Sequence, residues 1–128
     1  MADSPILELQ LELAAEGDPG EVAEMTARLR RELIQLDVQA VDQREAAKLP
    51  TGAKAAEAMM LGTLVVTLAR SAGTLASVVR ATQAWLSRSK GRTVKVELAG
   101  DSIELTGVSS RDQQRLIESW IERHAVQP

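Results

Sequence analysis

The stretch that decides the fold is AMMLGTLVVTLA, residues 58–69, which continues after Arg70 as SAGTLASVV, residues 71–79. No other part of the chain is so apolar. Apolar residues recur there at steps of three and four, and this spacing predicts one long helix from about residue 55 to residue 89. Such a helix must be covered by its own sheet, by a second subunit or by lipid, and the function depends on which of these covers it.

The predicted helix has three different sides. The side expected to face the core carries Leu61, Leu64, Leu68, Leu75 and Val79. A mildly polar side carries Thr63, Thr67, Arg70, Thr74, Ser77 and Ala81. The third side carries mainly small residues, namely Gly62, Val66, Ala69, Gly73, Ala76 and Arg80. Small residues let another backbone approach closely, so we expect this third side to contact a second copy of the chain.

A transmembrane span and burial within one monomer are the alternatives for this helix. Residues 58–79 are long enough to span a membrane, which takes about 20 apolar residues. Arg70 lies near their centre, however, where a charge costs roughly 2.5–3.5 kcal/mol on insertion scales. A span would also place the strands before and after it on opposite sides of the membrane. We therefore favour a helix that is buried by its own sheet and by a partner subunit.

The N-terminal part predicts a strand, a helix and a second strand. Leucines alternate with polar residues over 6–13, which is typical of a strand with one buried face. Asp18 and Glu21 have the spacing of a capping box at the start of a helix. The apolar stripe of that helix is Val22, Met25, Leu29, Leu33 and Leu36. Residues 37–43 predict a weaker strand, parallel to the first through a crossover, and residues 44–54 predict a loop.

The C-terminal part predicts a β-hairpin and a last helix. Strands over 92–98 and 102–106 are joined by a tight turn at Gly100-Asp101. The expected opposite pairs are Leu98 with Ile103 and Val96 with Leu105. Ser109 or Ser110 is expected to cap the helix. Its apolar face is Leu116, Ile117, Trp120 and Ile121.

These elements predict an α+β fold in the order β-α-β-α-β-β-α. We expect a four-stranded mixed sheet with the long central apolar helix packed on it. Residues 1–128 form a single domain in this interpretation, with flexible ends at 1–5 and 125–128.

The composition argues against several classes of function. Aromatic residues make up only 2% of the chain, which is too few for base stacking on single-stranded nucleic acid. The net charge of −3 does not favour binding to DNA. Cysteine is absent from the sequence, so disulfides and thiolate metal sites are excluded. No secretory signal is visible in MADSPILELQ, residues 1–10, and we expect a cytoplasmic protein that binds no nucleic acid.

Few residues are candidates for catalysis. His124 is the only histidine, and we expect it to be an exposed residue at a helix end. Residues 51–54, TGAK, lack the first glycine and the preceding strand of a phosphate-binding loop. The carboxylates that share a strand face or lie across from each other are Glu8 with Glu12 and Glu97 with Glu104. Solvated sheet residues explain both pairs, so we predict no enzyme and no catalytic, cofactor-binding or metal-binding residue.

Two other groups of residues each have two interpretations. Arg88, Lys90 and Arg92 follow the predicted helix, where cations match the helix dipole. The same three cations suit a phosphate, an anionic lipid surface or an acidic partner. Trp85 and Trp120 are each expected to pack in the core or to anchor an interface.

Several motifs together resemble a known bacterial family. They are the leading L-x-L-x-L strand, Asp18-Pro19, LRREL at 29–33, AWLSRSK at 84–90 and VKVE at 94–97. Over residues 6–124 this order resembles the effector-associated constant component family. The resemblance implies a small non-enzymatic accessory protein of bacterial conflict or self-defence systems. Members are found beside trypsin-like or caspase-like peptidases and NTPase modules, which they are thought to link or regulate. The family has no catalytic residues to transfer, and only the long helix with its ending at residues 85–88 transfers as an interaction element.

The resulting hypothesis is an adaptor that self-associates through the long central helix and couples to an effector protein such as a peptidase or an NTPase. The expected interface residues are Gly62, Val66, Ala69, Arg70, Gly73, Ala76, Arg80, Trp85 and Arg88. One alternative is a membrane-associated component that uses the apolar residues 58–79 and the basic cluster 88–92. A second alternative is a small-molecule binding module with a pocket between sheet and helix.

Overall fold

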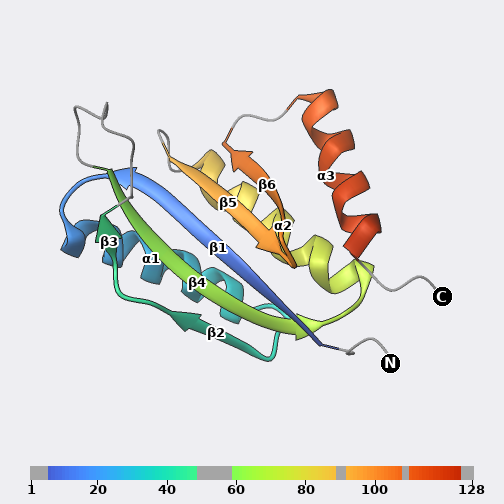
Figure 1. Cartoon of the computed structure of the whole chain (residues 1–128), viewed down its shortest axis with the longest axis horizontal. Coiled ribbons are helices and arrows are strands. Elements are labelled where there is room, and N and C mark those ends of the chain that lie inside the picture. The colour runs from blue at the N-terminus through green and yellow to red at the C-terminus, as the bar shows by residue number, and fades with distance from the viewer. Residues whose placement is uncertain (1–5, 49–58, 89–91, 108–109, 125–128) are drawn as a thin grey trace.

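The computed structural model describes residues 6–48, 59–88, 92–107 and 110–124. The elements, in chain order, are β1 (Ile6–Glu16), α1 (Pro19–Ile34), β2 (Ala40–Gln43), β3 (Ala47–Lys48), β4 (Met59–Ala69), α2 (Ala72–Ser87), β5 (Thr93–Leu98), β6 (Asp101–Thr106) and α3 (Arg111–His124). The strands form one sheet in the order β2-β4-β1-β5-β6, and the short β3 pairs with β4 on the same side as β2. The helices α1 and α2 lie behind the sheet in Figure 1, and α3 lies beside the β5–β6 hairpin.

The sheet differs from the predicted one in its strand number and its pairing. Within the described ranges the sheet has six strands instead of four. Every pairing is antiparallel, so the prediction of a mixed sheet is wrong. The strand predicted over residues 37–43 is β2, and it runs parallel to β1 as predicted, since both are antiparallel to β4, but it pairs with β4 and not with β1. It cannot reach β1 because β4 lies between the two and pairs with both of them.

The prediction of a long central helix is also wrong. Residues 59–69 form the strand β4, Arg70 and Ser71 make a bend, and the helix α2 begins only at Ala72. In the ranges that the structure describes, no helix is both long and apolar enough to cross a membrane. The predicted residues 55–58 and 89 lie outside those ranges. The membrane alternative therefore loses the helix on which it depended.

Local sequence explains why this stretch is a strand followed by a helix. Residues 62, 64, 66 and 68 are buried, whereas residues 61, 63, 65 and 67 are half-buried, so burial has the period of two that defines a strand. Threonine and valine occupy every position from 65 to 67, and such β-branched residues favour strands over helices. Ser71 then accepts a hydrogen bond from the backbone N–H of Thr74 at 3.1 Å and caps α2. The spacing of the leucines is compatible with a helix and with a strand. The alternation of buried and half-buried residues identifies a strand.

The first helix begins as predicted. Asp18 accepts a hydrogen bond from the backbone N–H of Glu21 at 2.8 Å, and Glu21 accepts one in return from the backbone N–H of Asp18 at 3.0 Å. This is the predicted capping box, and Pro19 is the first helical residue. Residues 22, 29 and 33 of the predicted stripe are buried, and residues 25 and 36 pack against the core. The amphipathic pattern was sufficient here because only one side of α1 is apolar.

The hairpin is confirmed, but its register is not the predicted one. The turn residues are Ala99 and Gly100, both in the left-handed region with φ of 53° and 85°. The paired residues are Leu98 with Asp101, Val96 with Ile103 and Val94 with Leu105. The shift by two residues keeps the same side chains on the buried face. Positive φ at both turn residues is typical of a type I′ turn, in which Gly100 is the second turn residue and Asp101 begins β6.

The core lies between the sheet and the helices. It combines the inward residues of β1, β4 and β5 with the buried sides of α1, α2 and α3. Trp85 and Trp120 are both part of it, with 6% and 2% of their surface exposed. In α3 the predicted apolar residues 117, 120 and 121 are buried, but Leu116 is 65% exposed. Ser110 caps α3 by accepting a hydrogen bond from the backbone N–H of Gln113 at 3.1 Å.

Candidate interaction surfaces

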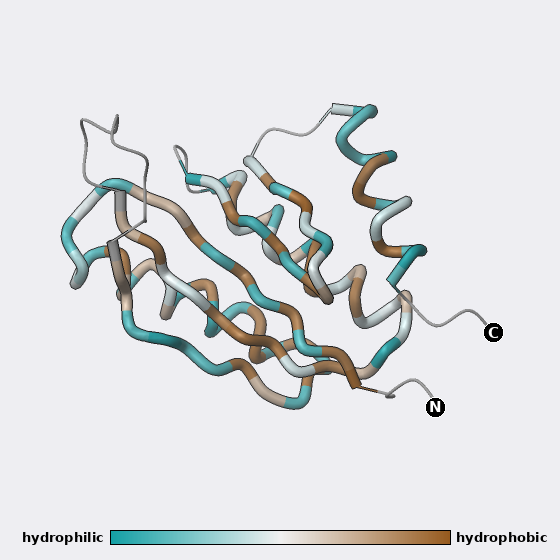
Figure 2. Tube along the Cα trace, in the orientation of Figure 1, coloured by the Kyte–Doolittle hydropathy of each residue, from teal (hydrophilic) through white to brown (hydrophobic). Residues whose placement is uncertain are grey.

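One side of the sheet is covered by none of the three helices that the structure describes. The even-numbered residues of β1 from 8 to 14 and the odd-numbered residues of β4 from 61 to 67 point to this side, and so do Asp42, Lys95, Glu97 and Glu104 through their pairing. We call this side the open face. Figure 2 shows hydrophobic and hydrophilic residues alternating along β1, because the leucines of that strand face the helices and its polar residues face away.

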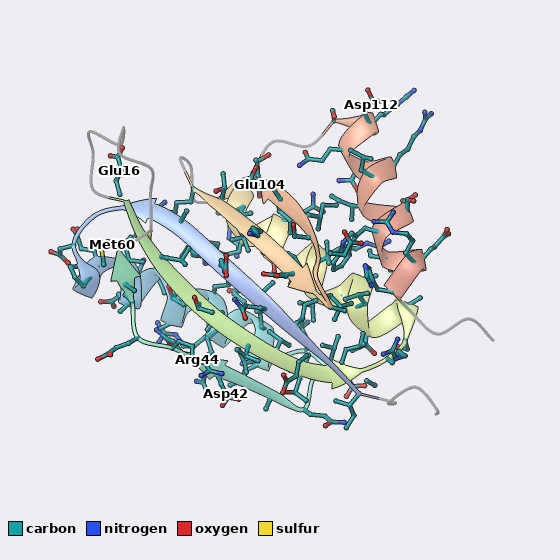
Figure 3. All side chains as sticks on the ribbon, viewed as in Figure 1. Glu16, Asp42, Arg44, Met60, Glu104 and Asp112 are labelled. Atoms are coloured by element: carbon teal, nitrogen blue, oxygen red, sulfur yellow. The ribbon has the colours of Figure 1, made fainter. Side chains whose placement is uncertain are left out.

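The middle of the open face is mildly apolar, and its surroundings are charged. Leu61 and Val65 of β4 lie half-buried in this middle part, and they alternate along the strand with Thr63 and Thr67. Lys95 lies 3.9 Å from Glu12 in an ion pair, and Gln10 donates a hydrogen bond to the same carboxylate at 2.6 Å. Figure 3 shows Asp42 and Arg44 on one border of the sheet and Glu104 on β6, toward the other. The surface therefore offers an apolar floor with charged groups around it.

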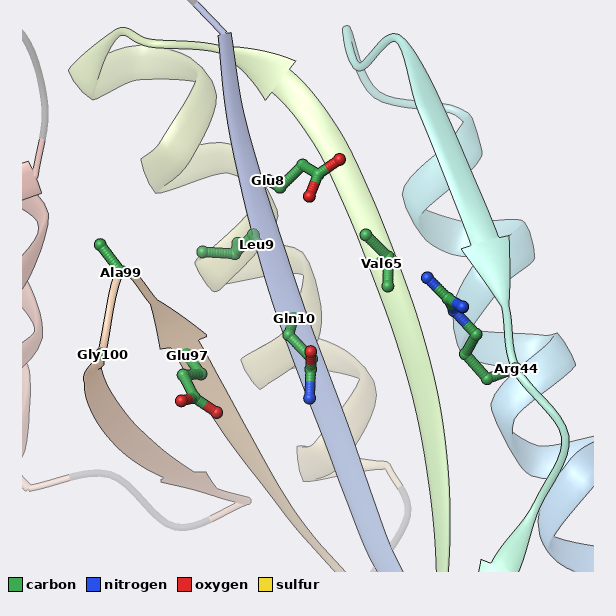
Figure 4. A pocket seen from close by; sticks show the side chains of 8 residues that line it. All are labelled: Glu8, Leu9, Gln10, Arg44, Val65, Glu97, Ala99 and Gly100. Carbon is green, nitrogen blue, oxygen red and sulfur yellow. The ribbon is translucent and has the colours of Figure 1, made fainter. Parts of the chain in front are cut away.

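A shallow hollow of about 230 Å³ lies on the open face near the hairpin. Its lining comes from β1, β4, β5, the turn and the residue after β2, namely Glu8, Leu9, Gln10, Arg44, Val65, Glu97, Ala99 and Gly100 (Figure 4). In the close-up, Glu8 and Arg44 approach Val65 from opposite sides, and Glu97 points outward from β5. The hollow thus presents two carboxylates, an amide and a guanidinium group around a valine. These groups suit a ligand that carries a positive charge.

The exposed side of α2 is a second surface. Residues at steps of four and three lie on it, and all are exposed: Gly73, Ser77, Arg80, Ala84 and Ser87. We call this the α2 outer face. Leu75, Val79 and Leu86 are buried on the opposite side of the helix, so the outer face points away from the sheet. Apart from Arg80, the outer face carries only glycine, alanine and serine.

The structure separates the predicted interface residues, which do not form one continuous surface. Gly62 and Val66 face inward from β4 and are buried in the core of the monomer, as is Trp85 of α2. The side chain of Ala76 packs partly against the core. The residues that remain on the surface together are on or next to α2, and they are Gly73, Arg80 and Arg88. Ala69 is the last residue of β4, and Arg70 lies in the bend before α2. The small residues were predicted to form one continuous side of a long helix. The change from strand to helix at the bend divides them between β4 and α2.

The predicted basic cluster is only partly described. Arg88 is the C-terminal cap of α2, and its guanidinium lies 3.6 Å from a carboxylate oxygen of Glu32 in α1. Both side chains are at least half exposed, so this ion pair contributes little to stability. Arg92 is half-buried, and Lys90 lies outside the described residues. Of this cluster, Arg88 therefore takes part in the contact between α1 and α2.

His124 takes part in a contact between α3 and the hairpin. Its Nε2 lies 2.7 Å from Oδ2 of Asp101, and an Arg123 guanidinium nitrogen lies 3.0 Å from the same oxygen. Its ring is 4.7 Å from the Trp120 ring, centre to centre. The hydrogen bonds from His124 and then Arg123 lower the pKa of Asp101 from its ordinary value of 3.8. These contacts hold the end of α3 against the hairpin turn. No sequence signal indicated them, because the partners are 22 and 23 residues apart.

The carboxylates considered for catalysis are spread over the open face. Glu8 and Glu12 do share one face of β1. Glu104 lies opposite Lys95 and not Glu97, whose opposite residue is Ser102. Among the residues with described positions, no group of three or more potential metal ligands comes together. Residues 51–54 lie outside the described part of the chain.

Comparisons with known proteins place the chain in no family. No model of a known protein family matches it, and no curated protein matches it either.

Proposed function

We propose that this chain is a non-enzymatic adaptor of a bacterial conflict or defence system, and that it self-associates and couples to an effector such as a trypsin-like or caspase-like peptidase. The observation that carries the proposal is the open face, a sheet surface with an apolar floor that no described part of the chain covers. The resemblance to the effector-associated constant component family supplies the class of partner. The open face and the α2 outer face replace the long helix as the candidate contact surfaces.

Two properties of the surfaces support an adaptor over an enzyme. The polar groups of the open face lie on a broad strand surface, and the hollow among them is shallow and largely open, unlike the deep, mostly apolar clefts typical of active sites. The closely interacting charged groups Asp101, Arg123 and His124 hold α3 to the hairpin. An adaptor needs only surfaces, and self-association would raise the local concentration of the effectors bound to it.

Co-expression tests the coupling to an effector. The tagged chain is produced together with the protein encoded by the neighbouring gene, and the eluate is analysed by size-exclusion chromatography with light scattering. We expect the two proteins to co-elute at a fixed ratio, and the chain alone to cleave no peptide substrate and hydrolyse no nucleotide. Co-elution with the neighbouring protein is then compared for two double variants. One has lysine in place of Glu8 and Glu97 on the open face, and the other has lysine in place of Glu118 and Glu122 on α3. Separate elution of the two unmodified proteins would contradict the coupling.

A small-molecule binding module is the second candidate function. The hollow on the open face favours it, since Glu8 and Glu97 line this space together with Arg44. Thermal unfolding in the presence of spermidine or free arginine tests this candidate. A rise in the unfolding temperature that disappears in Glu97→Gln supports a cation site, and no rise argues against it.

A further inference from the structure

We propose that the open face of one copy receives the α2 outer face of a second copy, so that the chain self-associates head to tail. The inference deepens the proposed function and rests on the self-association that it includes. It names both surfaces and commits to a second copy as the occupant. Three properties of the two surfaces carry it, namely their charge, their shape and their position on opposite sides of the molecule.

The open face carries more carboxylates than cations. Lys95 is engaged with Glu12 at 3.9 Å, and Arg44 is the other cation. Within the described ranges, none of the remaining carboxylates of this face forms an ion pair, and they are Glu8, Asp42, Glu97 and Glu104. Burial of such a face against a neutral or acidic surface would leave these charges unpaired. Its partner must therefore carry positive charge.

The α2 outer face supplies that charge without any acid. The sequence has no aspartate or glutamate between Glu57 and Glu97, a stretch that includes all of α2. Arg80 lies at the middle of the outer face and is exposed, and its side chain has no ion-pair partner among the described residues. Arg88 follows at the end of the helix, where it is paired with Glu32 of α1, so Arg80 is the cation that this surface offers to a partner. The two surfaces of one chain are thus complementary in charge.

The two surfaces also fit in shape. Apart from Arg80, the α2 outer face has only glycine, alanine and serine, so its backbone can lie close to a sheet. The floor that it would contact is the row of half-buried residues 61, 63, 65 and 67 in β4. The 16 residues of α2 span about 24 Å and the 11 residues of β4 span about 36 Å, so the helix fits within the length of the strand. The result is a third layer on the sheet, a helix donated by the neighbouring copy.

The positions of the two surfaces determine the type of assembly. The buried side of α2 faces the sheet, so its outer face and the open face point in opposite directions from one chain. Each copy can then donate its helix to one neighbour and accept a helix from another. Such heterologous contacts produce closed rings or open filaments instead of a twofold dimer. An assembly of this kind gathers several effectors through one repeated contact.

Disulfide cross-linking tests the contact, because the natural chain has no cysteine. Ser77→Cys on the α2 outer face and Thr63→Cys on the open face are purified separately, mixed, and oxidised mildly. We expect a cross-linked product of twice the 13.8 kDa chain mass in this mixture. Ser77→Cys mixed with Ser119→Cys, on the exposed side of α3, is the matched control and should give severalfold less product. Thr67→Cys provides a second position on the open face if Thr63→Cys folds poorly.

Charge reversal completes the test. Arg80→Glu added to Ser77→Cys should reduce the cross-linked product severalfold, whereas Arg115→Glu on α3 should not. Equal product in the control mixture, product from Thr63→Cys alone, or no product in any mixture would overturn the inference. Product from Thr63→Cys alone would mean that two open faces meet each other. None of these failures bears on the coupling to an effector, which co-elution with the neighbouring protein tests separately.

Discussion

Gly62→Ala tests whether residues 59–69 form a strand packed against α1. In the structure the missing side chain of Gly62 points at Thr26 of α1. A methyl group there would lie 3.2 Å from Cβ and 3.4 Å from Cγ2 of Thr26, and well inside contact distance of its hydroxyl oxygen. In the long-helix interpretation the same substitution replaces a helical glycine by alanine. The two interpretations predict effects of opposite sign on the free energy of unfolding.

The structure indicates how large the effect should be. Thr26 is only 1% exposed, and its hydroxyl donates a hydrogen bond to the carbonyl oxygen of Val22 at 2.7 Å. Room for the new methyl group requires α1 to move away or this hydrogen bond to break. Overpacking of this kind typically costs 1–3 kcal/mol, so we expect Gly62→Ala to lower the free energy of unfolding by about 2 kcal/mol. A glycine within a helix would instead gain about 1 kcal/mol from the change to alanine.

Urea unfolding followed by the fluorescence of the two buried tryptophans measures the change. Thr26→Ala removes the hydroxyl and the methyl group that the new side chain meets, so in that background Gly62→Ala should cost under about 1 kcal/mol. Gly73→Ala is the matched control, since apart from its chain neighbours and the backbone of its own helix no atom lies within 4 Å of the position of its added Cβ. A Gly62→Ala chain as stable as the natural one, or an equal cost in both backgrounds, would refute the packing of β4 on α1.

Three further substitutions test other parts of the structure. Gly107→Ala would place a Cβ 2.6 Å from the carbonyl oxygen of Leu86, and we expect thermal unfolding to show a loss of about 1–3 kcal/mol. Asp18→Ala removes one half of the capping box and should cost about 1 kcal/mol in the same measurement. The contact with His124 lowers the pKa of Asp101, so its contribution to stability is present above the ordinary value of 3.8 and is lost as the pH falls through the lower pKa of the folded state. In Asp101→Asn the decline of unfolding free energy below about pH 4 should therefore be less steep, and an unchanged decline would argue against the contact.

The elements that the sequence predicted best are those with one clear periodicity. β1 alternates strictly over residues 6–13, and α1 has both a capping box and an amphipathic stripe, so each was assigned correctly. The β5–β6 hairpin was found because both strands alternate. Its register was predicted incorrectly because a shift of two residues leaves the same side chains on the buried face. Alternation alone does not choose between registers that differ by two.

The central stretch was assigned incorrectly because two periodicities overlap in it. Leu61, Leu64 and Leu68 have helical spacing, although only the last two are buried together. The strand depends on pairing with β1, which is more than 40 residues away, and a long-range contact of this kind leaves no mark in local spacing. The open face was missed for the same reason, because it exists only when β4 joins the sheet. A signal was nevertheless present in the β-branched residues 65–67 and in Ser71, which begins the second helix.

The mass of the purified, unmodified chain is the most direct test of an adaptor that assembles through its own surfaces. Light scattering without detergent, over a wide range of concentrations and at low and high salt, measures it. We expect a mass that exceeds 13.8 kDa and rises with concentration, and that falls toward the monomer at high salt because the contact pairs a basic helix with an acidic sheet face. A constant mass of 13.8 kDa under all these conditions would contradict self-association.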